Sequence, residues 1–274
     1  MKRKLAIVLL LCLSLSLVIT GCGSKDAATN NNQATDESWQ NIKDQGYFTI
    51  GLDDAFPPMG FREKGSNDIV GFDIDLAKEA AKRMGVEVKF QPVVWDTIVE
   101  ELNGGNIDMI WNGLTITPDR QKQIAFTKPY IASHQIIVVN MNSTLADKKA
   151  LAGKKVGVQA GSSAIEAVEK DQATYKSFGE LVQFDNNVDA LTDLASGRID
   201  AVVVDEVVGR YYIAKKANQY KILEDNFGSE DYGVGLRKND KAFLAELQKA
   251  LDAMKADGTS AKISEKWFGE DIMK

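Results

Sequence analysis

The chain has 274 residues, of which 44% are hydrophobic and 26% are charged, with 39 Asp and Glu against 33 Lys and Arg. This acidic balance argues against nucleic acid or anionic lipid as a binding partner, because both repel a negatively charged surface. The single histidine and the two cysteines offer no cluster of metal ligands.

Residues 1–21 have the pattern of a cleavable export signal. Lys2, Arg3 and Lys4 precede an apolar run over residues 5–19, which is the order of charge and hydrophobicity in such signals. The apolar run has about fifteen residues, whereas a helix that spans a membrane needs roughly twenty. We therefore expect residues 1–21 to be removed rather than to anchor the chain.

Residues 19–22, Ile-Thr-Gly-Cys, resemble the bacterial lipobox, in which the cysteine becomes the first residue of the mature chain and carries a lipid. Cys12 lies in the discarded segment, so Cys22 has no partner, and an unpaired cysteine in an exported protein requires an explanation. The resemblance implies a lipid such as palmitate on Cys22 as the only membrane contact. The alternative is an ordinary signal peptide with an incidental cysteine.

The segment after Cys22 is predicted to be a flexible tether over residues 22–38. It consists mainly of Ser, Lys, Asp, Ala, Thr, Asn and Gln, a composition that buries too little apolar surface to offset the entropy of ordering. Without the three signal cations, 30 Lys and Arg face 39 Asp and Glu, a net charge of −9 for the mature form. About 235 residues remain for one large domain or two small ones.

Short β-rich runs alternate with amphipathic stretches along this remainder, which predicts an α/β fold with largely parallel strands. Residues 47–52 are expected to form the first strand and residues 86–90 another. Between them, residues 73–85 are predicted to form a helix, with Asp73 as its cap and Gly85 as its terminator.

One sequence pattern occurs twice. Residues 102–110 match residues 194–202 in order and type around the core L-x-x-G-x-I-D, and each copy has the pattern of a helix end, a glycine turn and a strand start. The spacing of ninety-two residues far exceeds the period of a repeat array, so we expect two similar lobes. The alternative is a coincidence between two ordinary α/β units.

Residues 154–163 are predicted to open the second lobe as a strand that leads through a loop into a helix. Ser163 and Glu166 have the spacing of a capping box, which would leave backbone N–H groups pointing out of the helix start as an anion site. The alternative is a well-capped helix without a ligand. Near the end of the chain, several apolar side chains are expected only to pack: Leu244, Leu247, Leu251, Met254, Ile263, Trp267 and Phe268.

Five segments, in the same order, make the chain similar to the family 3 periplasmic amino-acid-binding proteins. The resemblance covers nearly the whole mature chain and is carried by residues 51–61, 70–76, 111–120, 126–130 and 197–205.

This resemblance implies a type II periplasmic-binding-protein fold, in which two α/β lobes are joined by two crossing strands. Lobe 1 would comprise residues 39–133 and 233–274, and lobe 2 residues 134–232. The crossings are expected near residues 132–136 and 229–233. The ligand would lie between the lobes, outside the strand ends.

A free amino acid carries a carboxylate and an ammonium, and both need partners when they are buried. An arginine fork suits the carboxylate, and an aspartate suits the ammonium. The resemblance assigns the carboxylate to Arg120, with help from the backbone N–H groups of Thr115 and Ser163.

The resemblance assigns the ammonium to Asp205, with help from the backbone carbonyl of Asn112 or Gly113. Without the resemblance, Arg120 has the pattern of a surface helix residue, and Asp205 that of a carboxylate at a strand end.

For the ligand side chain, the resemblance points to Asp53 as the partner of a basic or amide group, and Gln159 is a further candidate near the far end. Phe56 and Trp95 match an aromatic pair that sandwiches the ligand, and aromatic faces suit flat or cationic groups. The alternative for these two is core packing. The pair Trp95-Asp96 is also similar to relatives that bind cystine, so cystine or cysteine is the alternative to a basic or glutamine-like ligand.

Two other classes of function are open on the same fold. Some relatives are dehydratases or lytic enzymes, which need a general acid or base; His134 falls near a predicted crossing strand, which favours a structural role, whereas Asp53 or Asp54 could serve. A sensor is the second alternative, and no spanning stretch follows Trp267. We expect a monomeric binding protein without cofactor or enzyme activity, held at the extracytoplasmic face of the bacterial membrane, that delivers its ligand to an ABC permease.

Overall fold

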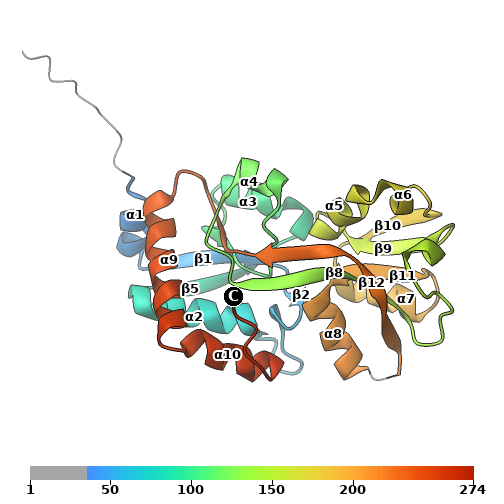
Figure 1. Ribbon diagram of the computed structural model, residues 1–274. Coiled ribbons are helices and arrows are strands. Elements are labelled where there is room, and N and C mark those ends of the chain that lie inside the picture. Colours follow the sequence, from blue (N-terminus) through green and yellow to red (C-terminus); the bar gives the residue numbers. More distant parts are fainter. Residues whose placement is uncertain (1–35, 217) are drawn as a thin grey trace, which may run out of the picture. The chain divides into compact units, whose positions relative to one another are not determined.

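The structure is a computed structural model that describes residues 36–216 and 218–274. The predicted export signal, Cys22 and most of the predicted tether therefore lie outside the described residues. Figure 1 shows two α/β lobes side by side within residues 36–274. We call them the first lobe and the second lobe and define each by its main sheet.

The first lobe is built on a five-stranded sheet. In spatial order its strands are β5 (Glu87–Pro92), β1 (Tyr47–Leu52), β6 (Met109–Ile110), β13 (Gly235–Leu236) and β7 (Ala125–Phe126). Strand β1 runs parallel to β5 and β6, whereas β13 is antiparallel to its neighbours β6 and β7. The expected first strand is confirmed in its bounds, and the next major strand begins one residue later than expected.

Helices and a small sheet complete the first lobe. The helices are α1 (Ser38–Gln45), α2 (Phe72–Met84), η1 (Trp95–Thr97), α3 (Ile98–Asn103), α4 (Pro118–Gln123), α9 (Lys241–Ala256) and α10 (Thr259–Phe268). The small antiparallel sheet has strands β2 (Ala55–Phe56), β3 (Gly60–Arg62) and β4 (Ile69–Val70). The first lobe thus combines the beginning and the end of the described chain (Figure 1).

The second lobe is built on another five-stranded sheet. Its strands are β10 (Glu180–Phe184), β9 (Lys155–Gln159), β11 (Ala201–Asp205), β8 (Ile131–Asn140) and β12 (Tyr220–Tyr232). Strands β10, β9 and β11 are parallel to one another. Strand β8 is antiparallel to both of its neighbours, β11 and β12. Its helices are η2 (Lys148–Leu151), α5 (Ser163–Lys170), α6 (Gln172–Tyr175), α7 (Asn187–Ala195) and α8 (Glu206–Lys215).

Strands β8 and β12 connect the lobes. They pair antiparallel from Asn140 with Tyr220 to Ile131 with Tyr232, with two shifts of register between. The chain enters the second lobe along β8 and returns along β12 into β13 of the first sheet, and Figure 1 shows the two strands side by side between the lobes. A bridge between Thr115 and Tyr232 also ties the end of β12 to the first lobe.

Helix α2 confirms one predicted end and corrects the other. Gly85 follows the helix in the left-handed conformation, with φ 73°, as expected of a glycine terminator. The prediction that Asp73 caps the start is wrong, because α2 begins at Phe72 after Gly71. The Asp73 carboxylate instead accepts a hydrogen bond from the backbone of Gly113, forty residues away.

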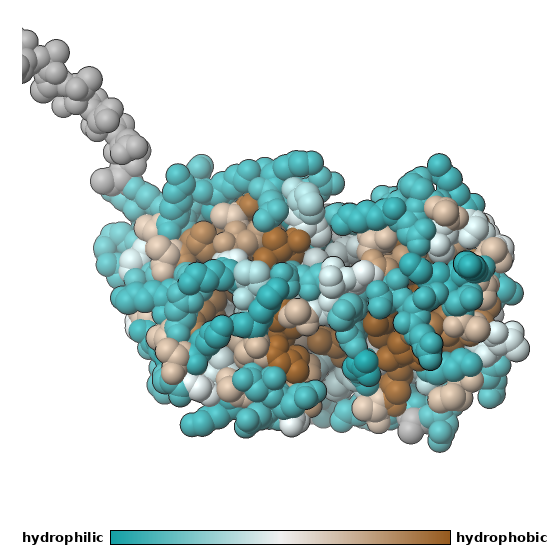
Figure 2. All heavy atoms as spheres, viewed as in Figure 1, coloured by the Kyte–Doolittle hydropathy of each residue, from teal (hydrophilic) through white to brown (hydrophobic). Residues whose placement is uncertain are grey.

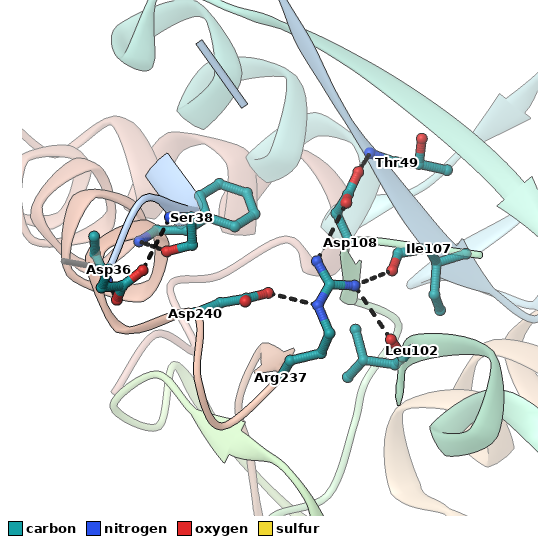
Figure 3. A network of polar contacts seen from close by, with 10 residues as sticks. Asp36, Ser38, Thr49, Leu102, Ile107, Asp108, Arg237 and Asp240 are labelled. Carbon is teal, nitrogen blue, oxygen red and sulfur yellow. Dashed lines mark hydrogen bonds and ion pairs between the residues drawn. The ribbon is translucent and has the colours of Figure 1, made fainter. Parts of the chain in front are cut away.

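Helix α1 begins at Ser38, so the last residue of the segment expected to be a tether already belongs to a helix. Figure 3 shows Asp36 and Ser38 beside the start of α9. The Asp36 carboxylate accepts a hydrogen bond from the N–H of Ala242 at 2.6 Å, and the Ser38 hydroxyl accepts one from Phe243 at 3.1 Å. These contacts satisfy N–H groups that a helix start leaves without partners.

The predicted apolar face of α9 is confirmed. Leu247, Leu251 and Met254 are buried and belong to a large core that also contains Phe48 and Phe243. On the face drawn in Figure 2, hydrophilic residues cover most of the surface and apolar residues show in separate patches. No helix in residues 36–216 or 218–274 is long and apolar enough to cross a membrane.

Candidate ligand site

The predicted site residues lie where parallel strands end. Asp53 follows β1, Asn112 and Gly113 follow β6, Gln159 ends β9, and Asp205 ends β11. Strands β1 and β6 are parallel neighbours in the first lobe, and β9 and β11 are parallel neighbours in the second. The carboxyl ends of the strands of each sheet therefore carry polar side chains at one edge, the usual place for a ligand in such sheets.

Polar contacts join these two edges directly. The side-chain amide of Gln159 in the second lobe donates to Asp53 Oδ2 of the first lobe at 2.8 Å. The Arg120 guanidinium of the first lobe donates to the carbonyl of Gly161 in the second lobe at 3.1 Å. The residues on both sides are buried, with exposures of 7% or less for Asp53, Arg120 and Gln159. The edges thus face each other at contact distance.

A third contact between the lobes corrects the expected capping box. The Thr117 hydroxyl donates to Glu166 Oε1 at 2.9 Å, so Glu166 bonds to the first lobe. Ser162, rather than Ser163, is the residue before α5, and the Ser163 hydroxyl contacts Thr115 at 2.9 Å. The capping-box prediction is wrong because contacts with the other lobe occupy both side chains. Ser163 is the first residue of α5, so its backbone N–H has no acceptor within the helix.

Arg120 lies on the short helix α4, whose start is capped by the Thr117 hydroxyl. Its guanidinium donates to the carbonyl of Thr115 at 3.0 Å as well as to Gly161, and it lies 5.8 Å from the centre of the Trp95 ring. Burial lowers the pKa of Arg120 from its usual value, an effect that nearby carboxylates oppose. A buried guanidinium held by carbonyls and a ring presents a fixed positive charge.

Asp205 lies at the end of β11 and accepts a hydrogen bond from the side-chain amide of Gln135 at 2.6 Å. The same amide nitrogen lies 3.0 Å from both carboxylate oxygens of Glu230. Burial and the neighbouring Glu230 carboxylate raise the pKa of Asp205 well above its usual range. Arg120 thus brings a cation, and Asp205 a carboxyl group, to the facing edges.

Sequence reasoning missed Gln135 and Glu230. Gln135 lies on β8 and Glu230 on β12, within the segments predicted to cross between the lobes. Side chains alternate along a strand, so Glu230 and the buried Tyr232 lie on one face, as do Ser133 and Gln135. The sequence signal was a set of polar residues inside the predicted crossing strands. To recognise them as site residues, one needs to know how β8 and β12 pair.

Asp53 is held by its own loop and by the other lobe. Asp53 Oδ1 accepts a hydrogen bond from the N–H of Ala55 at 2.8 Å, and its own N–H donates to Asn112 Oδ1 at 3.1 Å. Gln159, which donates to Asp53, is oriented in turn by the amide of Asn187 at 2.9 Å. Burial raises the pKa of Asp53. The carboxyl group is thus positioned with one partner on each oxygen.

Phe56 and Trp95 stack with parallel ring planes, 3° apart, at 6.4 Å between centroids. A flat group that touches both faces needs about 7 Å between the rings. The centroid distance is an upper limit on the distance between the ring planes, and Phe56 and Trp95 come from different apolar clusters. The two rings can therefore hold a flat group once they move apart, although packing alone also accounts for their burial.

Gly113 is supported from below by a buried acid. Asp73 Oδ2 accepts hydrogen bonds from the N–H of Gly113 at 2.7 Å and from the hydroxyl of Tyr130 at 3.0 Å. Burial raises the pKa of Asp73 to about 7. Gly113 has φ 60°, and a side chain there would meet the Phe56 ring at 2.9 Å, so glycine suits both the backbone and the space.

His134 lies apart from the predicted ligand contacts. Its Nδ1 is 2.8 Å from Glu206 Oε2, and its side chain is 46% exposed. Within residues 36–216 and 218–274, no three His, Cys, Asp or Glu side chains gather in an arrangement suited to a metal ion.

A model of the bacterial extracellular solute-binding proteins, family 3, matches residues 48–270. The chain belongs to this family. Among curated relatives, the L-cystine-binding protein TcyJ of Escherichia coli (strain K12) is 32% identical over 235 residues, which cover 85% of this chain and 86% of the relative.

Solved structures with the same fold include a substrate-binding protein of an ABC uptake transporter from Streptococcus pneumoniae with bound histidine. It is 34% identical, with a TM-score of 0.83 and coverage of 87% of this chain and 98% of the other. An ancestral arginine-binding protein bound to arginine is 42% identical, with a TM-score of 0.76 and coverage of 82% and 99%. The type II two-lobe fold is confirmed, and these relatives carry the names of binding proteins rather than enzymes.

Proposed function

We propose that the chain is the substrate-binding component of an ABC importer and binds a polar amino acid, basic or glutamine-like, between its two lobes. One observation carries this proposal: buried Arg120 brings a guanidinium and buried Asp205 brings a carboxyl group to the facing edges of the lobes. An amino acid needs both charges once its carboxylate and ammonium leave water. The named ligands of the relatives, histidine and arginine, support the same class.

The charges of the site favour a basic side chain. Asp53, Asp205 and Glu230 supply three carboxyl groups, whereas Arg120 supplies one cation among these contacts. The head group of an amino acid adds no net charge, so a cationic side chain improves the balance at Asp53. Phe56 and Trp95 offer two ring faces to a flat cation such as a guanidinium, an arrangement that cation–π attraction favours.

Glutamine and cystine are the alternatives. A glutamine amide would donate to Asp53 without the charge gain. Cystine is supported by the similarity to TcyJ and by the pair Trp95-Asp96. Its second head group adds no net charge to balance the carboxyl groups of the site, and the carboxylate of that head group needs a further cation or donor. We therefore rank basic amino acids above glutamine and cystine as ligands.

Binding would proceed by domain closure. The contacts of Asp53 with Gln159 and of Arg120 with Gly161 exist only when the facing edges meet. A ligand held by both lobes favours the closed arrangement by its additional contacts there. In this proposal, residues 39–133 and 233–274 move together as the first lobe, and residues 134–232 move together as the second lobe.

The proposed ligand contacts are the ten residues of the sequence analysis: Asp53, Phe56, Trp95, Asn112, Gly113, Thr115, Arg120, Gln159, Ser163 and Asp205.

The proposal also includes lipidation of Cys22 after removal of residues 1–21, attachment to the extracytoplasmic face of the membrane, and delivery by a monomer to an ABC permease. A Cys22→Ser variant expressed in bacteria supplied with labelled palmitate should lose the label that the natural sequence acquires. Label on both would contradict lipidation at Cys22.

A thermal-shift screen tests the ligand class. The chain from residue 23 onward, unfolded and refolded to remove any retained ligand, is heated with arginine, lysine, histidine, glutamine or cystine. A ligand that binds only the folded form raises the melting temperature. The largest rise with a basic amino acid supports the proposal, and the largest rise with cystine establishes the alternative ligand. No rise with any of the five contradicts binding of a polar amino acid.

A further inference from the structure

Glu230 occupies the centre of the polar cluster between the lobes. Its Oε2 accepts a hydrogen bond from the Thr115 hydroxyl at 2.7 Å and from the Ser163 hydroxyl at 3.1 Å. Thr115 belongs to the first lobe and Ser163 to the second, while Glu230 lies on the crossing strand β12. One carboxylate therefore contacts both edges of the site and the connection between them.

Glu230 also lies beside the second acid of the site. The Gln135 amide nitrogen is 2.6 Å from Asp205 Oδ1 and 3.0 Å from both oxygens of Glu230, so the two carboxyl groups share one donor. Two carboxyl groups brought together out of water do not both ionise readily, because each charge disfavours the other.

The cluster has more hydrogen-bond acceptors than donors. With both carboxyl groups ionised, they would offer about eight acceptor positions, whereas two threonine or serine hydroxyls, one amide group and one tyrosine hydroxyl supply about five hydrogens. These donors belong to Thr115, Ser163, Gln135 and Tyr232. A positively charged group with several N–H donors would correct both the excess of acceptors and the excess of negative charge.

We propose that Glu230 is a second ligand-binding carboxylate, which receives the α-ammonium group of the amino acid together with Asp205, so that binding releases a proton from Asp205. The inference rests on the proposed function, because it takes the ligand to be an amino acid with its ammonium at Asp205. The backbone N–H groups of Thr115 and Ser163 remain for the carboxylate, while their hydroxyls hold Glu230 in place.

The direction of the proton transfer follows from the charges. In the structure, burial and Glu230 raise the pKa of Asp205, so its carboxyl group retains a proton at a pH where an ordinary aspartate has lost it. A bound ammonium favours the ionised carboxylate and lowers that pKa. Between the two values the proton leaves to the buffer, and affinity rises with pH across the same window.

Other ionisable groups also lie around Asp205 and Glu230. Arg120 of α4 is a nearby cation that favours ionised carboxylates, and Tyr232 of β12 also lies close, with its pKa raised well above the usual value by burial. Glu206, which follows Asp205, is occupied elsewhere by His134 and Arg210. Asp205 is therefore the group whose ionisation a ligand ammonium changes most directly.

Calorimetry of L-arginine binding counts the protons. The heat of binding is measured at about pH 7 in phosphate and in Tris, whose ionisation enthalpies differ, and the difference gives the protons released per ligand. The natural sequence should release on the order of half a proton to one proton. Glu230→Gln should release less than half as many and should bind L-arginine on the order of tenfold more weakly above neutral pH. Its affinity should also change less between about pH 5 and about pH 8.

Glu206→Gln is the matched control, because it replaces a neighbouring carboxyl group by an amide outside the cluster, and it should release as many protons as the natural sequence. An arginine analogue with hydrogen in place of the α-ammonium group should bind weakly and release no proton, which tests the pair even if Glu230→Gln fails to fold.

The outcomes separate the two proposals. Binding of L-arginine without proton release, or release from Glu230→Gln equal to that of the natural sequence, overturns the role of Glu230 and leaves the proposed function standing. Absence of binding by arginine, lysine, histidine, glutamine and cystine alike overturns both. Proton release that depends on Glu230 and on the ligand's α-ammonium group supports both.

Discussion

The two copies of L-x-x-G-x-I-D form the same structural unit in the two lobes. In the first lobe, Asp108 Oδ2 accepts a hydrogen bond from the N–H of Thr49 on β1 at 2.8 Å. In the second lobe, Asp200 Oδ2 accepts one from the N–H of Lys155 on β9 at 2.9 Å. Each aspartate thus binds the backbone of the neighbouring parallel strand, and the carboxyl end of that strand leads to Asp53 or Gln159 of the site.

The two copies differ in what surrounds them. Figure 3 shows Arg237 beside the first copy. It donates to the carbonyl of Ile107 at 2.6 Å and to that of Leu102 at 3.2 Å, and its Nε lies 2.7 Å from Asp240 Oδ2. In the second copy, Asp200 corresponds to Asp108, and among the described residues its one cationic partner is the half-exposed Lys154 at 3.9 Å.

This difference reflects how each sheet is completed. The first sheet includes β13 from the end of the chain, and Arg237 follows β13 directly. The second sheet is complete within one continuous stretch from β8 to β12. A shared local unit is therefore sufficient for the second lobe, whereas the first adds a long-range anchor where the chain returns.

The largest expected effect concerns the charges that the two lobes bring to the site. Arg120→Ala and Asp205→Asn should each weaken binding of a basic amino acid by about 3 kcal/mol or more, because each leaves one buried charge of the ligand without its partner. Calorimetry measures the loss. Arg210→Ala, an exposed cation paired with Glu206, is the control and should retain near-natural affinity. Natural affinity in either site variant would contradict the assignment of that charge.

The next effect tests the long-range anchor. Arg237→Ala should lower the free energy of unfolding by about 2 kcal/mol, since it removes donors from two carbonyls and the partner of Asp240. Lys154→Ala, the corresponding change near the second copy, should cost less than about 0.5 kcal/mol because its ion pair is long and half exposed. Urea denaturation measures both. Equal losses in the two variants would refute the difference between the lobes.

The next effect accumulates with pH and is smaller than the two above only for each single pH unit. It distinguishes the polar residues that hold the two edges of the site. Asp73 supports Gly113 in the first lobe, and the neutral Asn187 supports Gln159 in the second. Burial raises the pKa of Asp73 from 3.8 to about 7, so between these values the native protein binds more protons than the unfolded chain. Its contribution to stability is full below that range and is lost as pH rises through about 7, by up to about 1.4 kcal/mol per pH unit.

Asp73→Asn should flatten this fall, and Asn187→Asp should introduce a similar one in the second lobe. Urea denaturation at pH steps from about 4 to about 8 follows both changes. An unchanged slope in Asp73→Asn would show that the carboxyl group of Asp73 does not titrate in this range.

Local patterns predicted the features that depend on neighbouring residues. The bounds of β1, the glycine end of α2 at Gly85 and the two copies of the repeat all follow from short stretches of sequence. The fold class and the family came from the order of several motifs, and both are confirmed. The roles of individual site residues remain predictions.

The errors arose where a distant contact competes with a local preference. Asp73 has the local pattern of a helix cap but bonds to Gly113, and Glu166 bonds to Thr117 across the lobes rather than capping α5. Glu230 was missed because its position between both edges depends on the pairing of β12 with β8. The residues next to Glu230 in the sequence do not indicate how β12 pairs with β8.

The smallest effect tests how closely the two copies match. A Cβ atom on Gly51 would lie 2.3 Å from Ile107 Cδ1, and one on Gly157 would lie 2.6 Å from Ile199 Cδ1. Gly51→Ala and Gly157→Ala should each therefore cost about 1 kcal/mol in the free energy of unfolding, since overpacking forces the isoleucine to move. Valine lacks Cδ1, so the cost of each alanine should fall by about half or more when Ile107→Val or Ile199→Val is already present. Urea denaturation of the singles and doubles gives this coupling. Coupling in one lobe but not in the other would show that the match between the copies stops at the aspartates.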